Sequence, residues 1–199
     1  MKVGVIGAGR VGATLGRGFA AAGHQVAWGV RSPDDAEVED ARTVPAVVAW
    51  ADAVVLAVPF GAAKSAVEAA GDFAGKPLLD ATNPIGAGLS LLHGHDDSGA
   101  ERVASWATNA HVVKIFNTTG FENMANPAYP EGAVMMPFCG DDEGACEMAR
   151  ELASGIGFDA VFLGPLSKAR LLEPMALIWI TLAMQRGEGR DFAFRLARR

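Results

Sequence analysis

Cysteine, tyrosine and long apolar runs are all scarce in this chain. Its 199 residues include 2 cysteines and 1 tyrosine. Two cysteines are too few for a disulfide-stapled fold, and Cys139 and Cys146 lack the spacing of a metal-binding pair. We expect both to be buried as small apolar residues in a reduced protein. The longest apolar run, residues 175–184, is about half of the roughly 20 residues that cross a bilayer.

Positive charge is also in deficit. Lysine and arginine together number 17 against 23 aspartates and glutamates, a formal net charge of −6. A chain of this charge has no general attraction to nucleic acid or to an anionic membrane surface. Residues 3–6 run directly into glycines, which indicates a strand and not a signal peptide. We therefore expect a cytoplasmic protein that acts on small molecules.

What the chain has in quantity is apolar residues, at 50% of its length. Short apolar runs alternate with helix-like segments, which is typical of a parallel sheet covered on both faces. The predicted strands are residues 3–6, 25–30, 53–58, 77–81, 111–116, 134–139 and 159–163. The acidic segment 32–42 is expected to be a surface loop or short helix. The predicted fold is a Rossmann-type doubly wound α/β domain with a mostly parallel sheet, one domain over residues 1–199.

The glycine-rich stretch after the first predicted strand carries the strongest functional prediction. Gly7, Ala8, Gly9, Arg10, Val11 and Gly12 form a G-x-G-x-x-G pattern that opens a helix. In such a loop the first glycine permits a tight turn, the second allows backbone to approach a pyrophosphate, and the third allows close helix–strand packing. The free N–H groups of the helix terminus favour phosphate. We predict a dinucleotide site here.

The end of the second predicted strand indicates which dinucleotide. NAD-binding versions carry a carboxylate at this place to hold the ribose 2′-hydroxyl. Here Arg31 and Ser32 follow Val30, and the next carboxylate is Asp34. An arginine suits a 2′-phosphate, which a carboxylate would repel. The predicted cofactor is NADP(H).

Four segments together resemble the NADPH-dependent oxidoreductases that use the deazaflavin coenzyme F420. They are the glycine loop, residues 30–32, the turn at residues 80–84 and the run Val112-Val113-Lys114-Ile115-Phe116-Asn117-Thr118. The cytosolic reductase domains of six-transmembrane ferric and cupric reductases are similar too. The resemblance implies a Rossmann core in which NADP(H) stacks against a second redox cofactor, and a homodimer.

The resemblance also assigns roles to residues. It implies that Ala57, Val58 and Pro59 pass the adenosine and ribose, and that Thr82, Asn83 and Pro84 lie near the nicotinamide ribose. It places Asn117, Thr118, Thr119 and Gly120 at the second ring, as the hydride-transfer pocket. The run from Asn117 to Gly120 is closer to the flavin-using relatives than to the deazaflavin enzymes, so the second cofactor is coenzyme F420 or FAD/FMN.

The predicted function is hydride transfer between NADP(H) and a deazaflavin or flavin. Ring stacking matters more for this reaction than an acid or base, and the sequence shows no acid–base constellation. A ferric or flavin reductase that works without F420 remains an alternative, as does a non-catalytic NADP(H)-sensing module.

Three further features concern a buried charge, a possible metal site and the C-terminal segment. Lys114 in a strand is interpreted as half of a structural ion pair. His93, His95, Asp96 and Asp97 lie in a glycine-rich loop with no further ligands at defined spacing, so we predict no metal site. Residues 166–199 are predicted to be a C-terminal helical segment. Its apolar residues leave almost no polar face, which favours burial against a second subunit.

Overall fold

One eight-stranded sheet organises the chain. The computed structural model describes residues 1–199, and its strands lie in the order β3-β2-β1-β4-β5-β6-β7-β8. The strands are β1 (Lys2–Ile6), β2 (Gln25–Val30), β3 (Ala41–Thr43), β4 (Ala53–Leu56), β5 (Pro77–Asp80), β6 (His111–Lys114), β7 (Met135–Gly140) and β8 (Asp159–Phe162). All neighbours are parallel except β6 and β7, which are antiparallel. The predicted doubly wound, mostly parallel sheet is confirmed.

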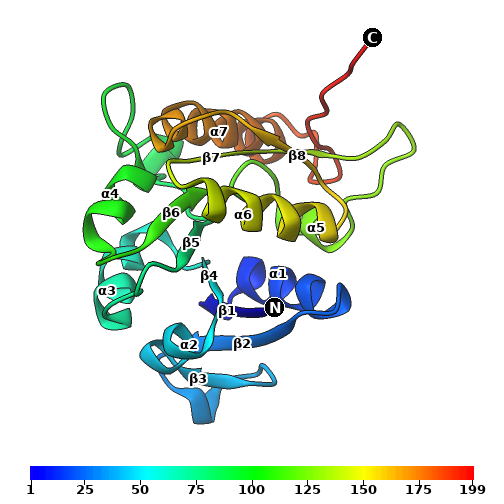
Figure 1. Cartoon of the computed structure of the whole chain (residues 1–199). Coiled ribbons are helices and arrows are strands. Elements are labelled where there is room, and N and C mark those ends of the chain that lie inside the picture. The colour runs from blue at the N-terminus through cyan, green and yellow to red at the C-terminus, as the bar shows by residue number, and fades with distance from the viewer.

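Helices cover both faces of this sheet. They are α1 (Arg10–Ala21), α2 (Val44–Trp50), α3 (Phe60–Ala70), α4 (Gly99–Trp106), α5 (Phe121–Ala125), α6 (Glu143–Gly155) and α7 (Ala169–Gln185). Figure 1 shows α1, α5 and α6 on one side of the sheet and α2, α3 and α4 on the other. Two separate apolar clusters fill the space between sheet and helices, and the four fully apolar residues of β4 contribute to both.

The strand order places a switch point beside the glycine loop. The chain moves outward from β1 through β2 to β3, then returns to the other side of β1 with β4. In open α/β sheets ligands bind at such a reversal, outside the carboxyl ends of the strands. The ends of β1 and β4 are the expected place for a cofactor.

Two elements differ from the prediction. The segment 32–42 holds a 3₁₀ turn, Pro33–Asp35, and also the beginning of β3, whose Ala41 pairs with Trp28. A three-residue edge strand is too short to show a period-two pattern. The short α5 was also absent from the prediction, since five residues are less than two helical turns.

The C-terminal segment has two parts. After the 3₁₀ turn Leu166–Lys168, α7 occupies residues 169–185. Residues 186–199, which we call the strap, form no helix or strand, so the prediction of a helical segment over 166–199 is wrong beyond Gln185. The Phe194 carbonyl oxygen of the strap accepts a hydrogen bond from the N–H of Met135 in β7, and the end of the chain runs away from the body of the molecule (Figure 1). No helix combines the length and the apolar character that crossing a membrane would require.

Candidate functional site

A cavity of about 990 Å³ opens at the switch point of the sheet. Its size lies at the upper end of the roughly 300–1,000 Å³ of small-molecule sites. Every residue that lines it falls between Ile6 and Ala69 in the chain. The cavity is therefore built by the ends of β1 and β2, the segment that follows β2, and residues of α1 and α3.

The glycine loop has the close contacts that its pattern predicts. Gly7 has a φ of +103°, and a Cβ there would lie 2.7 Å from the carbonyl oxygen of Ala57. A Cβ on Gly12 would lie 2.0 Å from the carbonyl oxygen of Gly7. By contrast, a Cβ on Gly9 would meet nothing within 4 Å, because it would project into the cavity that Gly9 lines. These glycines keep the backbone open to a pyrophosphate, and the loop fits the dinucleotide that the family pattern implies.

The first turn of α1 leaves its N–H groups for a ligand. Gly9 is its N-cap, no side chain caps it, and its first turn has no acidic residue. Uncapped N–H groups together with the helix dipole attract phosphate. Gly9 and Arg10 both line the cavity at this point.

Three arginines bring positive charge to the cavity. Arg10, Arg17 and Arg31 line it, beside the carboxylates Asp35 and Glu37. Arg10 and Arg31 were predicted from the sequence as dinucleotide-site residues, and Arg17 was not. A signal for Arg17 exists, because Arg10 and Arg17 are seven residues apart and therefore share a face of α1.

The structure brings some of the predicted cofactor residues to this cavity and not others. Those that line it are Gly7, Ala8, Gly9, Arg10, Arg31, Ser32, Val58 and Pro59. Those outside the lining are Val11, Gly12, Ala57, Thr82, Asn83 and Pro84. Gly12 acts through packing. Thr82, Asn83 and Pro84 follow β5, beyond β4, where the structure shows a buried polar network.

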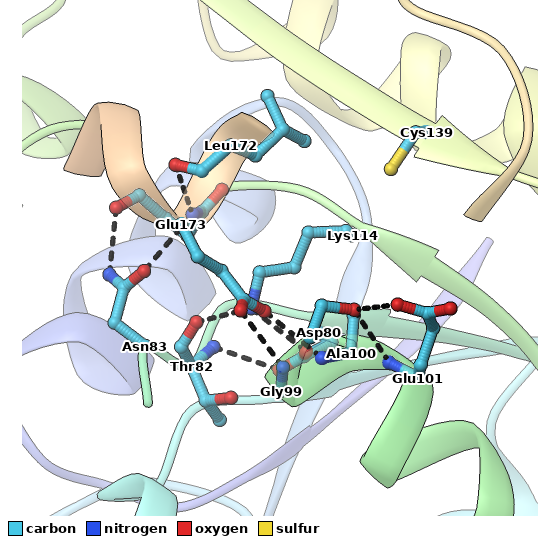
Figure 2. Close-up of polar contacts among 12 residues, drawn as sticks. Asp80, Thr82, Asn83, Gly99, Ala100, Glu101, Lys114, Cys139, Leu172 and Glu173 are labelled. Atoms are coloured by element: carbon cyan, nitrogen blue, oxygen red, sulfur yellow. Dashed lines mark hydrogen bonds and ion pairs between the residues drawn. The ribbon is translucent and has the colours of Figure 1, made fainter. Parts of the chain in front are cut away.

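Lys114 lies at the centre of that network (Figure 2). It is 0% exposed, and its Nζ lies 2.9 Å from Asp80 Oδ2 and 3.3 Å from Glu173 Oε1. It also donates to the carbonyl oxygen of Thr82. Asp80 and Lys114 are paired in register at the ends of β5 and β6. The interpretation of Lys114 as half of a structural ion pair is confirmed, with a second carboxylate that the sequence did not indicate.

Glu173 connects this network to α7. Its two carboxylate oxygens accept hydrogen bonds from the N–H groups of Gly99, at 2.8 Å, and Ala100, at 3.0 Å. These belong to the first turn of α4, whose N-cap is Ser98. Burial raises the pKa of Glu173, while the Lys114 charge and the two N–H groups oppose that rise. The network fixes α7 across the carboxyl ends of β5 and β6.

Two asparagines close the gap between the strand ends. Asn83 Nδ2 donates to the Asn117 carbonyl oxygen at 2.8 Å, and Asn117 Nδ2 donates to Asn83 Oδ1 at 3.0 Å. Asn117 Nδ2 also reaches the Leu172 carbonyl oxygen of α7, at 3.2 Å. Asn117 Oδ1 and Thr82 Oγ1 are buried without a hydrogen-bond partner. Buried polar atoms of this kind can accept a hydrogen bond from a ligand group.

The residues predicted for the hydride-transfer pocket are closed off. Asn117, Thr118, Thr119 and Gly120 are all buried. A Cβ on Gly120 would lie 2.5 Å from Trp179 of α7. The turn is at the predicted strand end, but it does not line the cavity at the glycine loop.

The remaining candidates have structural contacts. His93 Nδ1 lies 3.5 Å from Asp97, which also pairs with Arg102. No three His, Cys, Asp or Glu side chains gather as a possible metal site. Cys139 and Cys146 are free and buried, as expected. Burial raises the pKa of the Cys139 thiol to about 12.

Comparison with known proteins identifies the family. A profile described as NADP oxidoreductase, coenzyme F420-dependent, matches residues 2–84. The crystal structure of a putative F420-dependent NADP-reductase from Arthrobacter sp. FB24 is 30% identical, covers 100% of both chains and superposes with a TM-score of 0.89. The chain belongs to the F420-dependent NADP oxidoreductase family. It is an NADP-dependent oxidoreductase by family, and the prediction of NADP(H) as cofactor is confirmed at this level.

Two other proteins are similar to most of this chain. Metalloreductase STEAP3 of Rattus norvegicus is 29% identical over 182 residues, which are 88% of this chain and 36% of that protein. The chain thus spans about a third of the length of this curated relative. The structure of hypothetical protein SMa0349 from Sinorhizobium meliloti is 29% identical over 84% of this chain and 86% of that one, with a TM-score of 0.73.

Proposed function

We propose that this protein transfers a hydride between NADP(H) and the planar ring of a deazaflavin or flavin. The observation that carries the proposal is the cavity at the ends of β1 and β4, with an uncapped helix terminus and Arg31 where a 2′-phosphate would bind. The nicotinamide of NADPH supplies the hydride. The chain's own residues supply binding and orientation, which is what this reaction requires.

We propose the following residue roles. The N–H groups of the first turn of α1 hold the pyrophosphate, and Gly9 leaves room for it. Arg31 and Ser32 hold the 2′-phosphate, and Val58 and Pro59 pass the adenosine side. Thr82, Asn83 and Pro84 lie toward the nicotinamide ribose, and the turn from Asn117 to Gly120 toward the second ring.

The buried charges do not take part in proton transfer to a substrate. Asp80 and Lys114 are 0% exposed and Glu173 is 1% exposed. Their polar atoms are paired with one another and with the N–H groups of α4. Their part is to hold β5, β6 and α7 in register.

A second candidate acceptor is a ferric chelate, reduced without F420. The likeness to a protein named a metalloreductase favours it. One experiment separates the acceptors: NADPH oxidation measured anaerobically with coenzyme F420, FAD, FMN and a ferric chelate side by side. We expect reduction of F420 or a flavin with a strong preference for NADPH over NADH. Oxidation with the ferric chelate alone would favour the second candidate, and no oxidation with any acceptor would favour a sensing module.

We further propose a homodimer in the cytoplasm, formed through α7. Leu171 and Ile178 lie seven residues apart on one face of α7 and are 60% and 54% exposed. Met175 and Leu182, partly exposed, lie on the same face. An exposed apolar stripe of this length favours association with a second copy.

A further inference from the structure

The strap passes directly over the predicted second-ring site. Phe192 of the strap stacks on Trp179 with ring centroids 5.3 Å apart and ring planes 21° from parallel. Trp179 is 3% exposed. The same indole packs against Gly120, the last residue of the predicted hydride-transfer pocket. One face of an aromatic platform at this pocket is therefore covered by the strap.

Two donors converge on one oxygen beside that platform. The Phe192 carbonyl oxygen accepts from Trp179 Nε1 at 2.9 Å and from Asn123 Nδ2 at 2.7 Å. Asn123 Nδ2 also donates to Thr119 Oγ1 at 2.7 Å. The Tyr129 hydroxyl fixes the other end of that amide by donating to Asn123 Oδ1. A stacking face with two fixed donors at its edge suits a planar ring that carries a carbonyl group.

Arginines connect the strap to the cofactor cavity. Arg190 of the strap pairs with Glu122 and lies 5.3 Å from the ring centroids of both Phe121 and Trp179. Arg10, which lines the cavity, lies 5.6 Å from the same Phe121 ring. Phe121 therefore lies between an arginine of the phosphate loop and an arginine of the strap. The covered platform adjoins the dinucleotide site.

We propose that Trp179 and Asn123 form the binding site for a planar, carbonyl-bearing acceptor ring, and that Phe192 occupies this site until the ring displaces it. The phenyl ring stands in for the stacked heterocycle, and the Phe192 carbonyl occupies the position from which a ring carbonyl could accept from Asn123 Nδ2. This explains why the turn from Asn117 to Gly120 is buried although it follows a strand at the ligand-binding edge. The inference rests on the proposed function, since it concerns the acceptor of the same reaction.

The test compares binding of FMN and of coenzyme F420, each titrated without NADPH, to four forms of the full-length protein. These are the wild type, Phe192→Ala, a deletion of residues 190–199, and the control Leu196→Ala. Leu196 is a 40% exposed apolar side chain of the same strap. We expect Phe192→Ala and the deletion to bind at least one of the two probes at least 10-fold more tightly than the wild type, and Leu196→Ala to match the wild type.

A second measurement uses the wild type alone. Hydrogen exchange of the strap should become faster when the bound probe is added, because the strap leaves Trp179. Equal affinity in all four forms, no binding of either probe to any form, or unchanged exchange on binding would each overturn the inference. Failure of the proposed function is distinct: it would appear as probe binding and strap release without any NADPH-dependent reduction of the bound ring.

Discussion

At the scale of single residues, Arg31 is the side chain that we propose selects the dinucleotide. It follows β2, lines the cavity, and has Ser32 beside it instead of a carboxylate. Replacing it by alanine should weaken NADPH binding by about 1.5–3 kcal/mol, the size of a hydrogen bond to a charged group. NADH binding should change little, because NADH lacks the 2′-phosphate.

Fluorescence titration with both dinucleotides measures this. Arg42→Ala is a matched control, since Arg42 pairs with Asp40 on the surface and does not line the cavity. Equal losses of NADPH and NADH affinity would refute the assignment of Arg31 to the 2′-phosphate.

Lys114 carries the stability of the buried network. Its replacement by methionine leaves Asp80 and Glu173 buried without their cation, and breaking a buried pair in this way costs about 3–5 kcal/mol. Urea denaturation measures the loss. The control is Lys64→Met, because Lys64 pairs with Glu68 on the surface of α3 and should cost within about 0.5 kcal/mol. Similar losses for the two variants would show that the buried network contributes no more than a surface pair.

Glu173 makes stability depend on pH. Burial raises the pKa of Glu173 above the value of about 4.3 for an unfolded glutamate. Between these two values the folded state holds a proton that the unfolded state has lost. The unfolding free energy contributed by Glu173 is therefore full below pH about 4.3 and declines as pH rises through the folded pKa.

Glu173→Gln removes this titration. The difference in unfolding free energy, wild type minus variant, should fall as pH rises above about 4.3, whatever its absolute size. Urea denaturation at several pH values from 4 to 8 gives this difference, and the other carboxylates cancel because both proteins share them. A difference that stays constant over the range would contradict the raised pKa.

At the scale of elements, α7 is the part whose surroundings the sequence described least completely. Its apolar composition predicted burial on all sides. The structure buries Leu172, Ala176 and Trp179 within the chain and leaves Leu171 and Ile178 exposed. The composition of α7 does not indicate which of its apolar faces packs on the sheet of the same chain and which stays exposed.

Ile178→Glu tests whether that second face binds another copy. A charge in an apolar interface is costly to bury, so the variant should be monomeric or aggregated where the wild type is dimeric. Size-exclusion chromatography with light scattering at micromolar concentration measures the mass. Gln185→Glu, which adds the same charge at the exposed end of α7, should leave the dimer intact. A monomeric wild type would remove the proposed interface.

The glycine loop and most of the strands could be predicted because their causes are local. The close contacts at Gly7 and Gly12 exclude a side chain, and the six-residue glycine pattern reflects this directly. The apolar run of residues 53–56 forms the fully buried β4. The short β3 and α5 are held by their partners and lack a period of their own. The contacts of Glu173 with Gly99 and of Trp179 with Phe192 join distant segments, so no spacing in the sequence indicates them.

At the scale of the whole molecule, the charge around the cavity differs in sign from the net charge of the chain. The chain carries a net charge of −6, yet the three arginines and two carboxylates that line the cavity sum to +1. The overall charge predicted no attraction to nucleic acid, and the local charge suits a single phosphorylated small molecule. The two statements agree because a field near the site depends on the nearest groups.

The cavity lining ends at Ala69, and this has a consequence for how the protein comes into being. During synthesis the residues that line this cavity are present in the nascent chain well before β6, α7 and the strap have been made, since domains form from the N-terminus onward at the ribosome. The acceptor end that we propose uses residues 117–192, which arrive last. On that proposal, binding of the phosphates and choice of acceptor are encoded in separate stretches of the gene. Mutation can change the acceptor while the dinucleotide site is inherited intact.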